Sequence, residues 1–132
     1  MAETGTKLTR EQKIAKVRQA YRDLDAGKPG AGDFAPDCVW HSVIWGEVRG
    51  ADAIRAALRQ QREATEEFKI EPHAIVADDE HLVALLNVKV RAKGQTVEER
   101  LVQVFHVDDQ GQAREIWSYG TNPDPMKKLV GR

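Results

Sequence analysis

The histidine in the stretch CVWHSV, residues 38–43, is the side chain most suggestive of proton transfer. A histidine side chain titrates near neutral pH, so His41 is a candidate general base. A carboxylate that orients the second ring nitrogen would strengthen this role, and Glu47, Glu99 and Glu115 are the candidates. The structural alternative is a strand histidine that bonds to a nearby loop or faces solvent.

Two further polar side chains fall among apolar neighbours. Gln103 lies between Leu101 and Phe105 on one face of an expected strand, and a buried amide needs hydrogen-bond partners. Gln103 therefore serves either the fold or a ligand. Tyr21 belongs to the apolar stripe of an expected helix. Its hydroxyl is either satisfied within the core or directed into a cavity.

Two aromatic residues, Trp117 and Tyr119, lie near the end of the chain on one face of an expected strand. Glu115, two residues before Trp117, shares this face. Rings in this arrangement can stack on a flat ligand, and they can equally pack as part of the core. Trp45 falls in an expected turn, either at the mouth of a pocket or simply exposed.

The chain that must position these residues is predicted to form a helix, short strands, a second helix and then four long strands. A capping box at Thr9 and Gln12 starts the first helix, and Gly27 ends it. Two helices cannot cover both faces of such a sheet, so we expect them on one face of a curved α+β sheet that leaves an open cone. The predicted helices span 10–26 and 50–65, the predicted strands lie within 38–43, 44–49, 68–76, 82–92, 96–107 and 113–119, and residues 1–8 and 121–132 are expected to be flexible tails.

Composition limits the class of protein. At 132 residues, with 41% hydrophobic and 31% charged residues, the chain is expected to form one domain. Lys and Arg number 20 against 21 Asp and Glu, so no basic excess indicates a nucleic-acid partner. No stretch is apolar enough for a membrane span or a signal peptide, and the single cysteine, Cys38, has no disulfide partner, which fits a cytoplasmic protein. The four histidines lack metal-ligand spacing and no Gly-rich phosphate loop occurs, so neither metal nor cofactor is expected.

Four short stretches follow one another in a characteristic order within residues 9–120. They are Asp25-Ala26-Gly27, Phe34-Ala35-Pro36-Asp37-Cys38-Val39-Trp40-His41, Gly46-Glu47-Val48-Arg49-Gly50-Ala51-Asp52-Ala53-Ile54, and Asp109-Gln110-Gly111-Gln112-Ala113-Arg114-Glu115-Ile116-Trp117. In this order they resemble the NTF2-like superfamily, most of all its SnoaL-like and ketosteroid-isomerase-like branch. The resemblance implies a cone-shaped α+β fold, in which helices pack on the concave face of a mixed or antiparallel sheet. This fold hosts isomerases, cyclases, hydrolases, dehydratases and non-catalytic binders.

The best-understood chemistries of this superfamily require residues that this chain lacks. Ketosteroid isomerases use a carboxylate base after the first short strand, and a tyrosine with a protonated aspartate as the oxyanion hole. The base position falls here at Ser42 and the aspartate position at Gln103, while Tyr21 lies about two residues from the tyrosine position. Limonene-type epoxide hydrolases use an Arg-x-Asp pair, and the equivalent stretch Arg100-Leu101-Val102 has no acid. The resemblance therefore predicts neither activity.

The leading hypothesis from the resemblance is a cofactor-independent enzyme that acts on a hydrophobic organic substrate. His41 would move a proton during isomerisation, cyclisation or dehydration, and Gln103 with Tyr21 would bind the developing oxyanion. The alternatives are a binding protein without chemistry and a dimerisation module with a filled cone. The residues expected to contact the substrate are Trp40, Leu86, Val88, Phe105, Glu115, Trp117 and Tyr119.

The opposite face of the 96–107 strand carries Glu98, Arg100 and His106 together with Val102 and Val104. In the superfamily that face often forms a dimer interface, and valines flanked by complementary charges suit one. The alternative is a solvated face with an ion pair of little energetic worth. The resemblance therefore predicts a homodimer.

Overall fold

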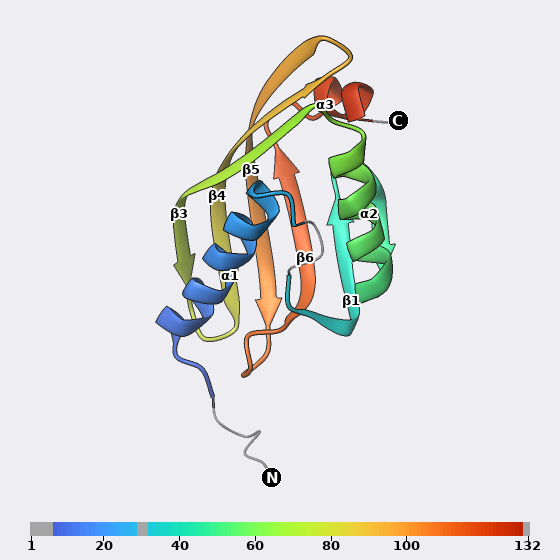
Figure 1. Ribbon diagram of the computed structural model, residues 1–132. Helices are drawn as coiled ribbons and strands as arrows, with labels where there is room; N and C mark the ends of the chain where they lie inside the picture. Colours follow the sequence, from blue (N-terminus) through green and yellow to red (C-terminus); the bar gives the residue numbers. More distant parts are fainter. Residues whose placement is uncertain (1–6, 29–31, 131–132) are drawn as a thin grey trace.

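A curved six-stranded sheet carries three helices in this computed structural model, as Figure 1 shows. The structure describes residues 7–28 and 32–130. The elements in chain order are α1 (Arg10–Asp25), β1 (Phe34–Ser42), β2 (Gly46–Arg49), α2 (Ala51–Glu63), β3 (Glu67–Ala77), β4 (His81–Ala92), β5 (Gln95–Val107), β6 (Ala113–Gly120) and α3 (Asp124–Val130). The strand order is β2-β1-β6-β5-β4-β3, so the predicted α+β architecture with a mixed sheet is confirmed.

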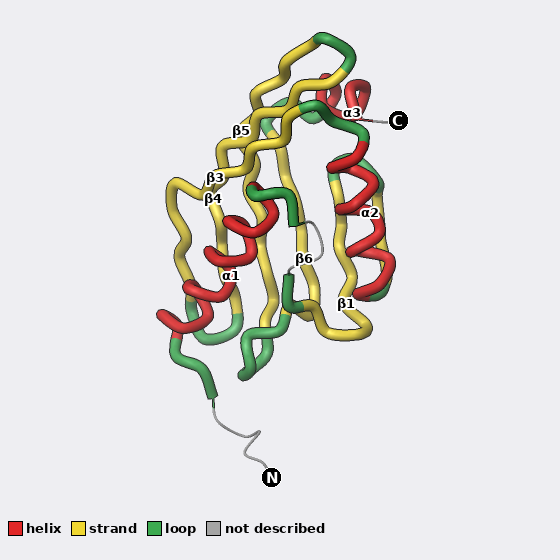
Figure 2. The backbone as a smooth tube through the Cα atoms, in the orientation of Figure 1, coloured by secondary structure: helices red, strands yellow, loops and turns green. Residues whose placement is uncertain are grey.

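The strands pair antiparallel except where β1 runs parallel to β6. β4 and β5 form a long hairpin, whose turn holds Lys93 and Gly94 at φ values of 53° and 74°. A tight two-residue turn needs positive φ at both positions, which glycine adopts without strain. Figure 2 shows that the long strands β3, β4 and β5 bend as they approach the end of the sheet where α3 lies.

The first helix begins and ends where the sequence predicts. Gln12 N donates to Thr9 Oγ1 at 3.1 Å, and Thr9 N donates to Gln12 Oε1 at 2.8 Å, so the capping box is complete. The helix ends at Asp25, followed by Gly27 with a φ of 87°. Val17 and Tyr21 are buried on its inner stripe. The start of α1 therefore determines where the Tyr21 ring meets the sheet.

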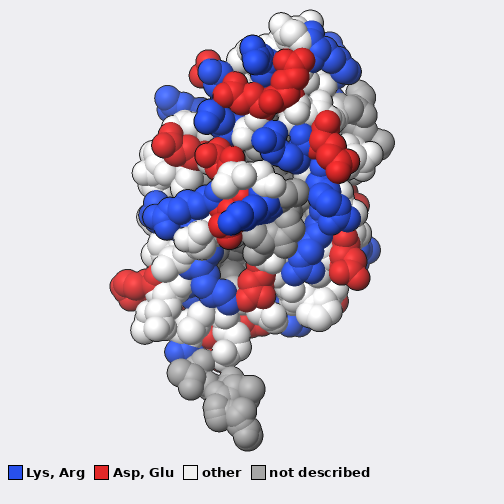
Figure 3. Space-filling model, viewed as in Figure 1, with Lys and Arg blue, Asp and Glu red and all other residues white. Residues whose placement is uncertain are grey.

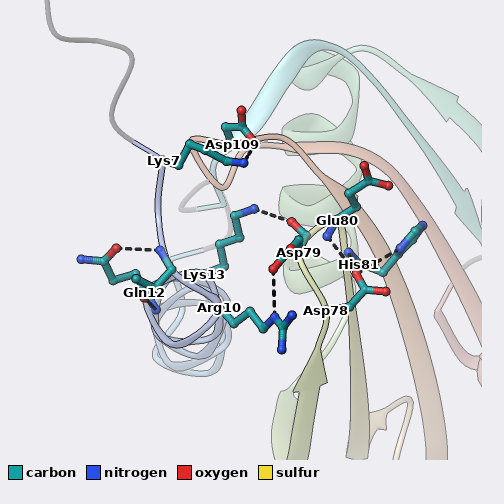
Figure 4. A network of polar contacts seen from close by, with 10 residues as sticks. Lys7, Arg10, Gln12, Lys13, Asp78, Asp79, Glu80, His81 and Asp109 are labelled. Atoms are coloured by element: carbon teal, nitrogen blue, oxygen red, sulfur yellow. Dashed lines mark hydrogen bonds and ion pairs between the residues drawn. The ribbon is translucent and has the colours of Figure 1, made fainter.

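Polar contacts join the start of α1 to the turn between β3 and β4 (Figure 4). Lys13 Nζ donates to the Asp79 backbone oxygen at 2.5 Å, and Arg10 Nε donates to Asp79 Oδ1 at 2.9 Å. The hydrogen bond and charge of Arg10 lower the pKa of the Asp79 carboxyl. Asp78 Oδ1 accepts hydrogen bonds from the backbone nitrogens of Glu80 and His81, which lower the pKa of Asp78. These contacts hold α1 across the concave face.

Within the segment 121–132, predicted from sequence as a flexible tail, residues 124–130 form the helix α3, and residues 131–132 lie outside the described residues. In α3, Met126, Leu129 and Val130 are buried against β4 and β5. Their i, i+3, i+4 spacing is helical, but a seven-residue helix inside a polar segment is too short to stand out from the sequence. At the other end, residues 1–6 of the predicted tail lie outside the described residues, and Leu8 N donates to the Asp109 backbone oxygen at 2.9 Å.

The core lies between the concave face and the helices. Leu82, Ala84, Leu86, Val88 and Val90 alternate along β4 and are buried on this face. The side chains between them are half-buried or exposed. No helix among the described residues is both long and apolar enough to cross a membrane.

Candidate functional site

A cavity of about 130 Å³ lies between the concave face of the sheet and the helices. Its wall is mostly apolar and draws on all three helices, with Val17 from α1, Ile54 from α2 and Met126 from α3. Phe68 and Ile116 contribute from the sheet. On the side of the molecule seen in Figure 3, acidic and basic side chains are interspersed. The interior therefore suits an apolar molecule, while the surface in this view shows no large field of one charge sign.

Four polar side chains of the cavity wall form one chain of hydrogen bonds. Tyr21 Oη donates to Gln103 Oε1 at 2.5 Å, and Gln103 Nε2 donates to Ser118 Oγ at 2.9 Å. Trp40 Nε1 donates to the same Ser118 oxygen at 2.9 Å. The four residues come from α1, β5, β6 and β1, so the fold alone brings them together. We call Tyr21, Gln103, Ser118 and Trp40 the cavity network.

Pairing across strands explains the geometry of the cavity network. Gln103 lies directly opposite Ser118 in the β5–β6 ladder, and Trp40 lies opposite Ile116 in the β1–β6 ladder. Directly opposed residues place their side chains on the same face within contact distance. The rings of Tyr21 and Phe105 pack in a T-shaped arrangement, with centroids 6.3 Å apart and planes at 76°. Tyr21 thus contacts β5 twice, through its ring at Phe105 and through its hydroxyl at Gln103.

Burial keeps the phenol of Tyr21 in its protonated form. The side chain is 5% exposed, and its desolvation raises the pKa of the hydroxyl well above the ordinary value. A protonated phenol donates a hydrogen bond, and its oxygen can also accept one. Tyr21 therefore acts in the cavity as a neutral hydrogen-bonding group across the neutral pH range.

Two carboxylates reach the cavity wall, and both are engaged. Glu99 is buried and accepts hydrogen bonds from Thr121 Oγ1 at 2.5 Å and from the backbone nitrogens of Arg100 and Asn122 at 3.0 Å each. Asp33 forms an ion pair with Lys16 and accepts from Gln112 Nε2 at 3.2 Å. Donors of the protein itself therefore already occupy both carboxylates. Among the described residues, no three His, Cys, Asp or Glu side chains gather to hold a metal ion.

Comparison with known proteins identifies the family. The sequence model of the SnoaL-like domain matches residues 17–116. The chain belongs to this family. The expectation from sequence is thereby confirmed, and no curated protein matches the chain.

Solved structures related to this SnoaL-like chain share its fold at low identity. Bal32a, from a soil-derived mobile gene cassette, is 18% identical with a TM-score of 0.81, over 92% of this chain and 98% of that chain. An LEH-like epoxide hydrolase of M. tuberculosis is 22% identical with a TM-score of 0.72, over 89% of each chain. A putative SnoaL-like polyketide cyclase from Jannaschia sp. CCS1 is 13% identical with a TM-score of 0.70, over 100% of this chain and 99% of that chain. At these identities the likeness shows the fold.

The residues proposed from sequence divide between the two faces of the SnoaL-like sheet. Tyr21, Trp40, Val88, Gln103 and Phe105 line the cavity. His41, Glu115, Trp117 and Tyr119, by contrast, alternate with cavity-lining residues of β1 and β6 and point to the convex face. Leu86 is buried on the concave face but packs in the core beside the cavity. None of these five side chains is among the residues that line the cavity.

On the convex face, His41 has the carboxylate partner that its expected role required. His41 Nε2 lies 2.7 Å from Glu115 Oε2, and the imidazole stacks on Trp117 with centroids 5.8 Å apart and planes at 14°. The side chains of His41 and Glu115 are 37% and 38% exposed. The expected pair exists, but the sheet separates it from the cavity. We call His41, Glu115 and Trp117 the convex cluster.

A β-bulge determines which side chains of β6 face the cavity. Val107 pairs with Ala113 and His106 pairs with Glu115, which leaves Arg114 as an extra residue in β6. A bulge of one residue reverses which side chains point inward. Ala113, Ile116 and Ser118 therefore line the cavity, although a strict alternation from Ala113 would turn Glu115 and Trp117 inward.

Sequence reasoning missed Ser118 and the cavity position of Glu99. Side chains of a strand alternate between its two faces, so Glu99 lies on the same face of β5 as Leu101, Gln103 and Phe105. The prediction that Gln103 faces the cavity therefore implies that Glu99 does so too. No comparable pattern marks Ser118, because its inward direction depends on the bulge at Arg114.

Proposed function

We propose that this SnoaL-like protein binds a hydrophobic organic molecule in the concave-face cavity. The observation that carries the proposal is an apolar wall interrupted by one connected hydrogen-bonding group, the cavity network. Binding sites for small molecules have this composition, with apolar surface for affinity and few polar groups for orientation. The relatives described as an epoxide hydrolase and a putative polyketide cyclase support an organic ligand, since both names imply organic substrates.

Binding without proton transfer through His41 fits the site best. A general base must come within hydrogen-bond distance of the proton that it removes. The ring of His41 lies on the convex face beside Glu115, and the carboxylates of the cavity wall, Glu99 and Asp33, are held by other donors. The sequence hypothesis assigned proton transfer to His41 and oxygen binding to Tyr21 and Gln103. The hydrogen bond between Tyr21 and Gln103 supports the second role, in which this pair binds an oxygen atom of the ligand.

A thermal-shift screen tests the proposal with aromatic polyketide-like, steroid-like and terpenoid compounds. A ligand that binds only the folded state adds about 2.7 kcal/mol at a concentration 100 times its Kd, which raises the melting temperature by several degrees. Val88→Phe fills the cavity wall, while Val83→Phe makes the same change on the convex side of β4. We expect the shift to disappear in the first variant and to persist in the second. Equal shifts in both variants would place binding outside the cavity.

We also propose that the protein is a homodimer through the convex face. Val104 lies opposite both Val83 and Trp117, and Val102 lies opposite both Leu85 and Tyr119, so the ladder aligns two apolar rows across neighbouring strands. Tyr119 is 58% exposed in the single chain. A second copy would remove these side chains from water, which favours association.

Light scattering tests the dimer directly. Val104→Glu introduces a charge into the aligned apolar rows, so we expect a dimeric wild-type protein and a monomeric variant with an unchanged circular-dichroism spectrum. A monomeric wild-type protein at high micromolar concentration would contradict the proposed interface.

A further inference from the structure

Two histidines that lie far apart in the chain meet on the convex face. His81 of β4 pairs directly with His106 of β5, and their rings stack with centroids 5.4 Å apart and planes at 22°. They alternate with the inward residues Leu82 and Phe105, so both imidazoles are on the side of the sheet away from the cavity. One ring is exposed and the other half-buried, so solvent reaches both. We call His81 and His106 the histidine pair.

A carboxylate determines which nitrogen of the His81 ring is free. Asp78 Oδ1 lies 3.3 Å from His81 Nδ1, and Figure 4 shows the two side chains facing each other beside the β3–β4 turn. A carboxylate in this position accepts the Nδ1 proton, which leaves the lone pair on Nε2. Histidines that bind metal ions typically have one ring nitrogen held by a carboxylate in this way. The His81 ring therefore presents the tautomer that a metal ligand needs.

The His106 ring is free to act as the second ligand. Within the described part of the chain, no hydrogen bond engages either of its nitrogens. Directly opposed residues of an antiparallel ladder have Cβ atoms about 4.5–5.5 Å apart, which is close enough for two imidazoles to share one ion. Zinc–nitrogen bonds are about 2.0–2.1 Å long, so a change of side-chain torsions at this accessible surface brings both nitrogens to the ion.

The charges around the histidine pair favour a cation. Asp78 contributes a carboxylate on one side, and Glu115 of the convex cluster is directly opposite the β5 member of the pair on the other. The neighbouring Arg114 forms ion pairs with Asp37 and Asp108, so its positive charge is balanced within the protein. Opposite charges attract across such distances, and a divalent ion gains more than a monovalent one.

We propose that the histidine pair binds a divalent transition-metal ion such as Zn²⁺ on the convex face. Imidazole is a preferred ligand of zinc, copper and nickel ions, whereas magnesium and calcium prefer oxygen. Because sets of three such ligands are absent from the described residues, water molecules complete the coordination and the ion exchanges with solvent. The sequence alone does not reveal this site, because the β4–β5 register brings its two ligands together.

Calorimetric titration of the untagged protein with Zn²⁺ tests the proposal. Loss of an outer-shell partner typically lowers metal affinity about 10–100-fold, so loss of a ligand should cost at least as much. We therefore expect His81→Gln and His106→Gln each to weaken Zn²⁺ binding about ten-fold or more. The matched control is His73→Gln, which changes an exposed histidine at the register shift of β3 and should keep the wild-type affinity.

The carboxylate that orients His81 has a smaller expected effect. Asp78→Asn keeps an oxygen for the backbone nitrogens of Glu80 and His81 but removes the negative charge. We expect Zn²⁺ binding to weaken in this variant, by less than in either ligand variant. Circular dichroism establishes that the compared proteins are folded.

Proton–nitrogen NMR spectra of the imidazole rings give a readout that a general change of stability would not produce. Addition of Zn²⁺ to the wild-type protein should shift the nitrogen signals of His81 and His106 together, with one midpoint, and leave those of His73 in place. In each ligand variant, the remaining ring of the pair should shift only at higher Zn²⁺ concentration.

Three results would overturn the inference. The first is a wild-type protein that binds Zn²⁺ no more tightly than the double variant of His81 and His106. The second is a loss of affinity in one ligand variant but not in the other, which would mean that the two rings do not share an ion. The third is an equal loss in His73→Gln, which would show that Zn²⁺ binds to exposed histidines without preference for the pair.

Discussion

The two faces of the sheet carry two polar groups of similar size with different physical settings. The cavity network on the concave face is neutral and mostly buried. The convex cluster pairs an imidazole with a carboxylate, and both side chains are more than one-third exposed. Hydrogen bonds strengthen where water is excluded, while partly solvated ion pairs contribute little. The histidine and the carboxylate, which are common catalytic residue types, therefore lie on the partly solvated convex face. The neutral hydrogen-bonding residues lie in the cavity, where water is largely excluded.

Neighbouring residues on the same strands separate the two groups. Trp40 and His41 are consecutive in β1, and Trp117 and Ser118 are consecutive in β6. Each pair has one member in the cavity wall and one on the convex face. A single bulge at Arg114 decides the direction of the β6 pair. The comparison can be tested by making the same change on each face.

The largest contrast is expected between Leu86 and Leu85, which are neighbours on β4. Leu86 is 1% exposed on the concave face, while Leu85 is half-buried on the convex face. We expect Leu86→Ala to lower the free energy of unfolding by about 3 kcal/mol and Leu85→Ala by about 1 kcal/mol. Urea denaturation measures both values. Equal losses would mean that the convex face is covered in solution, in which case the loss for Leu85→Ala should depend on protein concentration.

Alkaline pH should lower the free energy of unfolding, because it ionises the thiol of Cys38 in the unfolded chain before it does so in the folded protein. Burial, followed by the charges of Asp37 and Glu115, raises the pKa of its thiol from 9.0 to about 11. An unfolded chain ionises this thiol first, so stability is fully present below pH 9 and is lost as pH rises toward 11. From pH 8 to pH 10 we expect a loss of about 1 kcal/mol that Cys38→Ala removes. Urea denaturation of both proteins at the two pH values measures the difference, and an identical pH dependence would contradict the assignment.

The two tyrosines of the chain provide a matched test of the hydroxyl groups. Tyr21→Phe removes a buried hydroxyl that bonds to Gln103, whereas Tyr119→Phe removes one from a side chain that is 58% exposed. We expect the first change to cost about 1 kcal/mol of unfolding free energy and the second to cost nearly nothing. Chemical denaturation monitored by tryptophan fluorescence measures both. A larger cost for Tyr119→Phe would indicate that its hydroxyl is buried at an interface.

The smallest effect is expected at the convex cluster. His41→Ala removes a partly exposed hydrogen bond with Glu115 and a stacking contact with Trp117, so we expect a stability loss below about 1 kcal/mol. The affinity of any cavity ligand should stay unchanged, because the sheet lies between His41 and the cavity. Calorimetric titration of wild type and His41→Ala with the best thermal-shift ligand measures this. A clear loss of affinity or of turnover would restore His41 to a functional role.

Local sequence predicted the elements of this fold well, because their determinants lie close together in the chain. The capping box at Thr9 and Gln12 starts α1 as expected. Pro72 lies beside a register shift in β3, which is an edge strand of the sheet. The order of short motifs indicated the SnoaL-like family, which the match over residues 17–116 confirms. Gln103 and Tyr21, which the sequence shows as polar side chains among apolar neighbours, contact each other in the structure.

Tertiary structure decided which face of each strand became the cavity wall. The side chains of β6 alternate between the two faces of the sheet. Ile116 lies on one face and Trp117 on the other, so either face carries an apolar side chain that could be buried. The choice depends on the bulge at Arg114 and on pairing with β1 and β5, contacts that join residues far apart in sequence. The same holds for α3, whose short apolar stripe becomes stable only against β4 and β5. The sequence by itself thus determined the elements and the family, and long-range pairing decided which side chains share the cavity.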